Sequence, residues 1–214
     1  MRVVTHGRAK SGSVNQAGLL AVSLAFLSLS SVAAPGERGR TGEVTGTVRA
    51  QGVKKLADAV VYIEKVQGQF QATGTPVAVD QVKRTYIPHV SAVVVGTEIE
   101  FLNSDNEMHN VHARQNQTQL FNVGILPQRK ARRILKGEGV VTLLCDIHPE
   151  MSAYILVLQN PYFARPDEKG NYTIGSVPPG TYTLRAWHEK LKAQTMEIKV
   201  TEGGKVTADF ELKP

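Results

Sequence analysis

The stretch "VVTLLCDIHPEMSAYILVL", Val140–Leu158, has the pattern of two apolar strands joined by a short polar loop. Apolar runs rich in β-branched residues and bounded by turn residues are typical of buried strands. The loop begins at Cys145, the one cysteine of the chain, and holds a histidine three residues later and a methionine six residues later. With 6 histidines and 4 methionines in 214 residues, chance gives this spacing roughly once in two thousand cases. The spacing therefore predicts a ligand site rather than an inert buried cysteine.

The residue types of this loop favour copper. Two histidines, one cysteine and a distant methionine are the donors of a trigonal copper site with a weak axial bond. Cys145, His148 and Met151 supply three of these donors, and the fourth must come from another part of the chain. His109 is favoured because it follows a polar turn and begins a strand, while His112 lies at an odd offset and faces the other side of that strand. His112 and His89 remain as alternatives.

Zinc is the competing metal, because it also binds cysteine and histidine. A methionine ligand argues against zinc, and the affinity order of divalent metals places Cu(II) above zinc. We therefore expect one mononuclear type 1 copper ion per chain.

The rest of the chain after the first 40 residues predicts strands almost everywhere. Segments such as "GEVTGTVRA" (Gly42–Ala50) and "GTYTLRAW" (Gly180–Trp187) alternate or are β-branched, and turn signals such as "KGEG" and "VPPG" separate them at short intervals. Short strands at this spacing are typical of β-sandwiches. The sequence therefore predicts an all-β protein with a second strand-rich region beside the one that carries the copper loop.

The expected domain layout is an insertion. Residues 76–159 hold enough strands for one sandwich, but residues 160–214 hold too few for a comfortable core. Residues 41–67 would complete that outer sandwich, which is then split by the inserted domain. The alternative is two domains in series, with the early strands joining the middle domain.

The N-terminus predicts export. Arg2, Arg8 and Lys10 precede a short apolar run, "AGLLAVSLAFLSL" (Ala17–Leu29), and "SSVAA" (Ser30–Ala34) offers small residues for cleavage. We expect residues 1–34 to be a signal peptide, with an uncleaved anchor as the alternative, and the mature chain to be periplasmic or secreted without a membrane span. Cleavage removes three positive charges and lowers the formal charge from +6 to +3. This mild charge does not indicate a nucleic-acid partner.

The segments "VVVGTEIEFLNSDNEMHNV" (Val93–Val111) and "GVVTLLCDIHPEM" (Gly139–Met151) together resemble the cupredoxin family of small blue copper proteins. The short loop with proline after its histidine is most similar to that of the amicyanins. The resemblance implies a Greek-key β-sandwich that binds copper through His109, Cys145, His148 and Met151. It also implies that Asn110 braces the cysteine loop.

The outer segments resemble a second family. "GEVTGTV…DAVVYIEK" and "DEKGNYTIGSVPPGTYTLRAW" are similar to the carboxypeptidase regulatory-like (transthyretin-like) sandwich, an immunoglobulin-like fold. The combination of both modules resembles exported proteins labelled methylamine-utilisation or plastocyanin-like. That label is an association, because a fold does not fix a function.

Three functions are compatible with these patterns. The favoured one is a non-enzymatic electron carrier that exchanges single electrons with a transient redox protein partner in the cell envelope, because a site with four protein ligands leaves no open position for substrate. The second is an envelope-associated binding module whose transthyretin-like domain holds a protein or glycan, with copper structural or stored. The third is an enzyme subunit or a copper-delivery protein.

Overall fold

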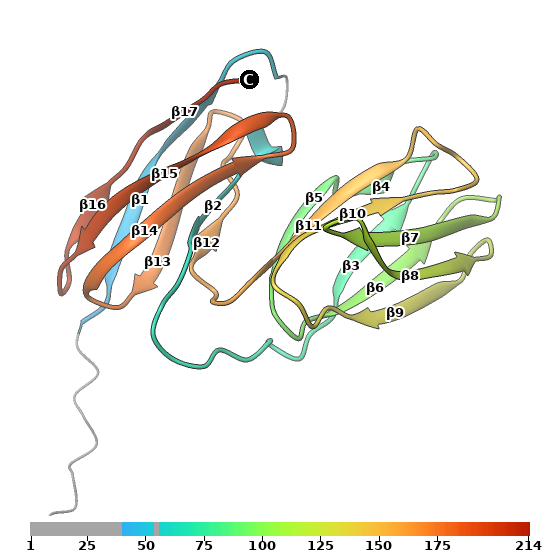
Figure 1. Ribbon diagram of the computed structural model, residues 1–214, viewed down its shortest axis with the longest axis horizontal. Coiled ribbons are helices and arrows are strands. Elements are labelled where there is room, and N and C mark those ends of the chain that lie inside the picture. The colour runs from blue at the N-terminus through green and yellow to red at the C-terminus, as the bar shows by residue number, and fades with distance from the viewer. Residues whose placement is uncertain (1–39, 54–55) are drawn as a thin grey trace, which may run out of the picture. The chain divides into compact units, whose positions relative to one another are not determined.

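A computed structural model describes residues 40–53 and 56–214 of the chain (Figure 1). The expected signal peptide, residues 1–34, lies outside the described residues. The described part forms four β-sheets and one 3₁₀ turn, η1 (Leu56–Asp58). The predicted all-β sandwich class is therefore confirmed. Within the described ranges, no helix is long and apolar enough to cross a bilayer.

Two of the sheets form the sandwich that carries the loop 145–151, and we call it the central sandwich. One sheet has the order β5-β11-β10-β7-β8, and the other has the order β4-β3-β6-β9. Their strands are β3 (Val77–Gln81), β4 (Tyr86–Ile87), β5 (Val90–Val94), β6 (Glu98–Asn103), β7 (His109–Gln115), β8 (Thr118–Ile125), β9 (Lys130–Ile134), β10 (Gly139–Leu144) and β11 (Ser152–Leu158).

The core of the central sandwich extends into the loop between β10 and β11. In β6, the alternation of Glu98, Ile99, Glu100 and Phe101 turns every second side chain inward, so that Ile99 and Phe101 are fully buried. The same buried cluster contains Cys145 and Met151 from the loop between β10 and β11. The loop is therefore fixed to the core at both of its ends.

The other two sheets form the outer sandwich. One has the order β13-β1-β16, with β17 also pairing with β1, and the other has the order β12-β2-β14-β15. Their strands are β1 (Gly42–Ala50), β2 (Val60–Ile63), β12 (Phe163–Ala164), β13 (Asn171–Val177), β14 (Gly180–His188), β15 (Leu191–Val200), β16 (Lys205–Thr207) and β17 (Phe210–Leu212).

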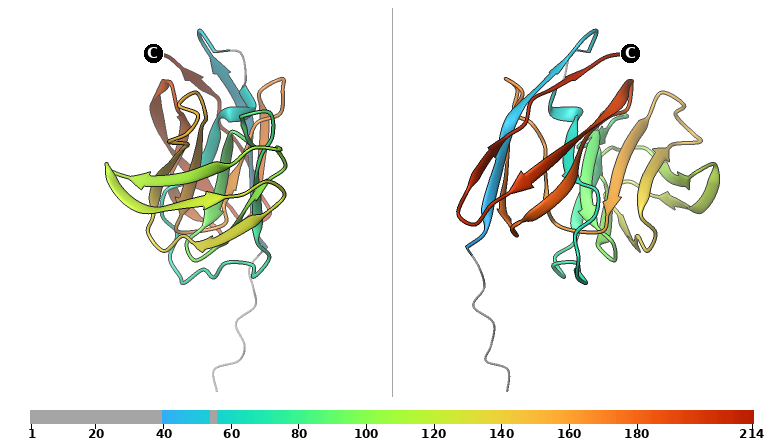
Figure 2. Two further views of the ribbon diagram at one scale, coloured as in Figure 1. Left: turned by 90° about the vertical axis from the view of Figure 1, so that its right-hand side faces the viewer. Right: turned by 60° about the vertical axis from the view of Figure 1, so that its left-hand side comes forward.

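Strands from the two ends of the described chain share the outer sandwich. β1 pairs in parallel with β16 and β17, and β2 pairs with β14. Figures 1 and 2 show the blue β1 beside the red C-terminal strands. The chain thus completes β1 and β2, forms β3 to β11 of the central sandwich, and returns to pair with its own beginning.

Most of the described chain forms strands, as predicted, and β5 and β6 are separated at Gly96, where φ is +89°. The strands β3, β4, β8 and β12 were not predicted. The hairpin between β7 and β8 turns at Asn116 and Gln117, and the hairpin between β3 and β4 turns at Lys83 and Arg84. All four residues have positive φ without being glycine, so the usual glycine signal of such turns is missing.

Candidate metal centre

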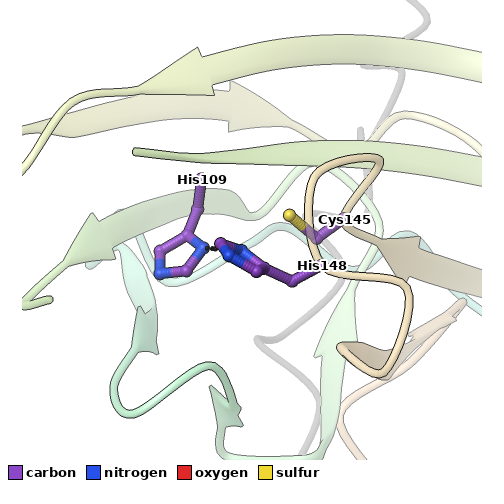
Figure 3. A group of neighbouring side chains, drawn as sticks. All are labelled: His109, Cys145 and His148. Carbon is purple, nitrogen blue, oxygen red and sulfur yellow. Dashed lines mark hydrogen bonds between the residues drawn. The ribbon is translucent and has the colours of Figure 1, made fainter. Parts of the chain in front are cut away.

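Three predicted ligands meet at one end of the central sandwich. His109 is the first residue of β7, Cys145 directly follows β10, and His148 lies in the loop before β11. One ligand atom from each lies within 4.8 Å of the other two. Figure 3 shows the two imidazole rings facing each other beside the cysteine sulfur. The seven-residue loop 145–151 and the start of a neighbouring strand therefore converge at a single point.

Burial separates the roles of these side chains. The His109 side chain is fully buried and that of His148 is 13% exposed, while Cys145 is 3% exposed as a residue. His148 is thus the member of the group nearest to solvent. Deeply buried polar atoms need partners. Burial alone therefore fits both a hydrogen-bonded network and a metal site.

The alternative histidines lie elsewhere. His112 points to the opposite side of β7, where its Nδ1 lies 2.8 Å from a carboxylate oxygen of Asp146. The ring nitrogens of His89 lie 3.0 Å from the carbonyl oxygen of Ser152 and 2.9 Å from a carboxylate oxygen of Glu189. Neither histidine belongs to the group around Cys145. The odd offset of His112 along the strand accounts for its position.

Met151 is buried beside the same group. It is 1% exposed and belongs to the core cluster that contains Cys145. Its backbone N–H donates to the carbonyl oxygen of His148 at 3.0 Å, which closes the loop just before β11. Met151 is therefore a buried side chain at the end of the loop, packed in the same apolar cluster as Cys145.

The two imidazoles present their Nδ1 atoms to each other beside the cysteine. These Nδ1 atoms lie 2.9 Å apart, within hydrogen-bond distance. The outer nitrogen of His109, Nε2, lies 2.9 Å from Asp105 Oδ2, and that of His148 lies 3.4 Å from Glu107 Oε2. A carboxylate accepts hydrogen bonds and cannot donate them, so the Nε2 of His109 carries a proton and its Nδ1 can accept the proton of the His148 Nδ1. A metal ion bound beside the cysteine sulfur would replace that shared proton.

The carboxylates beside the histidines are held in their ionised form. Burial favours a higher pKa for Asp105, but the backbone N–H groups of Arg84 and Lys83 and the His109 ring outweigh it, so the pKa is lowered from 3.8. The Arg84 guanidinium lowers the pKa of Glu107 from 4.5. Both groups therefore remain acceptors at neutral pH and complement positively polarised N–H groups of the rings.

Asn110 braces the loop, as the cupredoxin resemblance implied. Its side-chain oxygen accepts a hydrogen bond from the backbone N–H of Asp146 at 2.8 Å and from the Cys145 thiol at 3.3 Å. Its side-chain nitrogen donates to Asn122 and to the Asp146 carboxylate. One residue of β7 thereby fixes the position of the cysteine that begins the loop.

Tyr86 provides a second brace, from β4. This tyrosine is fully buried, and its hydroxyl lies 2.7 Å from the carbonyl oxygen of Asn110 and 3.0 Å from that of Leu144. Burial is the main cause of a raised pKa, so the hydroxyl stays protonated and able to donate. Sequence reasoning missed Tyr86, Glu107 and Arg84. Asp105 lies four residues before His109, and this spacing was the available signal.

In a comparison with protein families, one part of the chain matches a known family. Residues 149–213 match the family described as "Carboxypeptidase regulatory-like domain". The C-terminal segment matches this family. The expected carboxypeptidase regulatory-like resemblance is therefore confirmed for this segment, although the match begins at Pro149, ahead of the boundary expected at residue 160, and does not include β1 or β2. No curated protein matches the chain.

Solved structures that are similar to the chain include cupredoxins. A purple cupredoxin from Nitrosopumilus maritimus is 22% identical, with 38% of this chain and 98% of that chain covered and a TM-score of 0.35. A reduced Cu(I) form of an amicyanin mutant at pH 4 is 20% identical, with coverages of 47% and 98% and a TM-score of 0.37. A copper-containing nitrite reductase from Thermus scotoductus SA-01 is 20% identical, with coverages of 53% and 28% and a TM-score of 0.38.

Proposed function

We propose that this chain is an exported type 1 copper protein that carries single electrons between redox partners in the cell envelope. The observation that supports the proposal most is the meeting of His109, Cys145 and His148 within 4.8 Å at one end of the central sandwich. Met151, buried in the same core cluster as Cys145, is the proposed fourth ligand. One copper ion per chain would be held by these four side chains.

Copper bound there would supply exchange of one electron between its Cu(I) and Cu(II) states. The protein's part is to keep the donors in place. Cys145 and His109 lie at the ends of paired strands, and β10 and β7 are neighbours in one sheet. The hydrogen bond from the Asp146 N–H to Asn110 limits the movement of the loop relative to that sheet, and the bond from Tyr86 to the Leu144 carbonyl oxygen holds the strand end from which the loop begins. A rigid donor set lowers the reorganisation that accompanies electron exchange, and no substrate position is left open.

The donor set favours copper over zinc. Thiolate and thioether sulfurs are soft ligands, and a weak axial methionine is characteristic of copper electron-transfer sites. Structural zinc sites instead use four cysteine or histidine ligands. Cys145 is the one cysteine of the chain, and within the described ranges the cluster around it contains two histidines. Among the described residues, the fourth donor available to this group is therefore the buried thioether of Met151, and not a second thiolate or a third histidine.

Electrons are proposed to pass through His148, the ligand nearest to solvent. Met108 and Ile147, beside the two histidines in the sequence, are 45% and 47% exposed. Exposed apolar side chains next to a partly exposed ligand suit a transient partner, because apolar contacts exclude water without the directional demands of a permanent interface. The redox partner is therefore proposed to dock at this end of the sandwich.

The location and domain layout belong to the same proposal. We propose that residues 1–34 direct export and are removed, and that the central sandwich, about residues 76–159, is inserted into the outer one. The pairing of β1 with β16 and β17 supports the insertion, because residues 41–67 and 160–214 then build one core.

The decisive experiment is to load the purified, processed protein with Cu(II) and record its visible absorption. We expect an intense blue colour that ascorbate bleaches. Cys145→Ser and His109→Ala should abolish the colour, whereas His112→Ala, which removes a histidine from the same strand outside the cluster, should keep it. A colourless protein that binds zinc as tightly as copper would overturn the proposal and favour an envelope binding module.

A further inference from the structure

A tight turn lies beside the two histidines. Lys83 and Arg84 join β3 to β4 and have φ values of +51° and +56°. Val82 and Thr85 close the turn with backbone hydrogen bonds in both directions. Positive φ at two successive non-glycine residues is uncommon and costly, and it directs both backbone N–H groups of the turn toward the same neighbour.

That neighbour is Asp105, in the loop between β6 and β7. The backbone N–H of Lys83 donates to Asp105 Oδ1 at 2.6 Å, and that of Arg84 donates to Asp105 Oδ2 at 2.9 Å. Each carboxylate oxygen is therefore held by one donor. Oδ2 also lies 2.9 Å from the Nε2 of His109. The turn therefore positions the Asp105 carboxylate, and this carboxylate positions the His109 ring.

The side chain of Arg84 repeats the arrangement at the second histidine. Its Nε lies 2.6 Å from Glu107 Oε1 and its Nη2 lies 2.8 Å from Glu107 Oε2, a bidentate pair. Glu107 Oε2 lies 3.4 Å from the Nε2 of His148. One two-residue turn thus orients two carboxylates, and each carboxylate faces the outer nitrogen of one imidazole.

We propose that the Lys83–Arg84 turn, acting through Asp105 and Glu107, orients both proposed histidine ligands. Asp105 holds the Nε2–H of His109 and Glu107 lies beside the Nε2 of His148, so both Nδ1 atoms point inward. Lys83, Arg84, Asp105 and Glu107 are not proposed ligands; they are positioning residues. This inference rests on the proposed function of His109 and His148 as ligands.

The competing explanation is that these are ordinary surface ion pairs. The side chains of Arg84 and Glu107 are 52% and 40% exposed, and exposed ion pairs typically contribute little to stability. The two explanations therefore differ in what a substitution changes. A surface pair changes nothing at the rings, whereas a positioning pair changes the ring tautomers and the metal affinity while stability stays nearly constant.

The first test uses the metal-free protein and nitrogen-15 NMR of the imidazole rings. In the wild type we expect His109 to carry its proton on Nε2. Asp105→Asn should convert His109 to a mixture of tautomers, and Glu107→Gln should shift the nitrogen resonances of the His148 ring. Glu100→Gln is the matched control, because Glu100 is held by Lys130 and Arg132 instead. The Glu107 side chain is 40% exposed, more than that of Asp105, so its variant keeps the test valid if the Asp105 variant fails to fold.

The second test measures affinity for Zn(II) and Cu(I) by chelator competition. Removing a partner that orients a ligand typically costs 10- to 100-fold in metal affinity, so we expect a loss of about that size in both variants and none in Glu100→Gln. Tautomers and affinities equal to those of the control would overturn the inference. A wild type that binds Zn(II) but stays colourless with Cu(II) would instead contradict the proposed function, and the NMR comparison would still decide the positioning role.

Discussion

The side-chain oxygen of Asn110 lies 3.3 Å from the Cys145 sulfur and 2.8 Å from the backbone nitrogen of Asp146. This places one buried amide at the junction between β7 and the loop that supplies the other proposed ligands. The strand and the loop are far apart in the sequence, and Asn110 links them by hydrogen bonds at the residue that carries the thiol.

Replacing Asn110 by alanine should therefore loosen the loop. The Asp146 N–H and the Cys145 thiol would lose the acceptor that they share, and each lost hydrogen bond costs about 1 kcal/mol. We expect a loss of that size in the free energy of unfolding of the metal-free protein, measured by urea denaturation. Asn122 is exposed, and its side-chain amide bonds Asn110 and Asp146. The free energy of unfolding of Asn122→Ala should stay within about 0.5 kcal/mol of the wild type. Equal losses would contradict the bracing role.

Met151→Leu separates the axial ligand from the rest of the site. Leucine fills a similar volume, so this change to a buried side chain should cost less than about 1.5 kcal/mol of stability. Loss of the thioether removes a donor that stabilises the more highly charged Cu(II) state, so the blue colour should remain and the reduction potential should rise. Voltammetry of the copper-loaded protein tests this, and an unchanged potential would show that Met151 is not a ligand.

Tyr86→Phe removes only a hydroxyl from the core. That hydroxyl joins β4 to the backbone of β7 and β10 at Asn110 and Leu144. A lost buried hydrogen bond of this kind costs about 1–2 kcal/mol, which chemical denaturation should detect. Tyr182→Phe is the control, because Tyr182 is only partly buried and its hydroxyl bonds the carbonyl oxygen of Pro178 in the outer sandwich. A smaller loss is expected there, and the reverse order would contradict the role of Tyr86.

Gly46→Ala should disrupt the outer sandwich. A Cβ at Gly46 would lie 1.8 Å from the carbonyl oxygen of Ala208, which also accepts a hydrogen bond from the Tyr172 hydroxyl. The backbone must shift to relieve this overlap, at a cost of about 3 kcal/mol. Gly175→Ala is the matched control, since a Cβ there meets nothing within 4 Å. Calorimetry should show a lower melting temperature for the first variant and little change for the second.

Acid should destabilise the outer sandwich through Asp209. The Thr47 hydroxyl and backbone N–H lower the pKa of this carboxyl from its usual 3.8. A carboxyl whose folded pKa is lowered contributes stability above its unfolded pKa and loses it as pH falls through the folded value. The melting temperature should therefore be steady above about pH 5 and fall below about pH 4. Asp209→Asn should reduce that slope, and an unchanged slope would contradict the role of the Thr47 contact.

The ligand types could be predicted from residues close together in the sequence. The spacing of Cys145, His148 and Met151 places three donors in one loop, and this local pattern exists before any folding. The two-residue period of a strand then separated His109 from His112, and the structure brings only the first of them to Cys145. Local geometry was sufficient there because a strand allows each side chain one of two faces.

The supporting residues were beyond prediction for a physical reason. The Lys83–Arg84 turn has no glycine or asparagine to mark it, and its left-handed backbone is held by contacts with Asp105, a residue of another loop. The same holds for β8, an edge strand whose side chains are mostly exposed and whose turn at Asn116 and Gln117 lacks glycine. An exposed edge strand has little hydrophobic contrast between its faces, so its sequence resembles a loop.

Three properties could be predicted from residues close together in the chain: that it is built of strands, that its one thiol lies in a short loop with a histidine and a methionine, and that His109 and His112 occupy opposite faces of β7. These properties follow from chemistry within a few residues. The gathering of β4, β6 and β7 around that loop, and its support by Tyr86, Asp105 and Glu107, became visible in the folded protein alone. Such contacts join segments far apart along the chain, and they exist only once the sheets have packed.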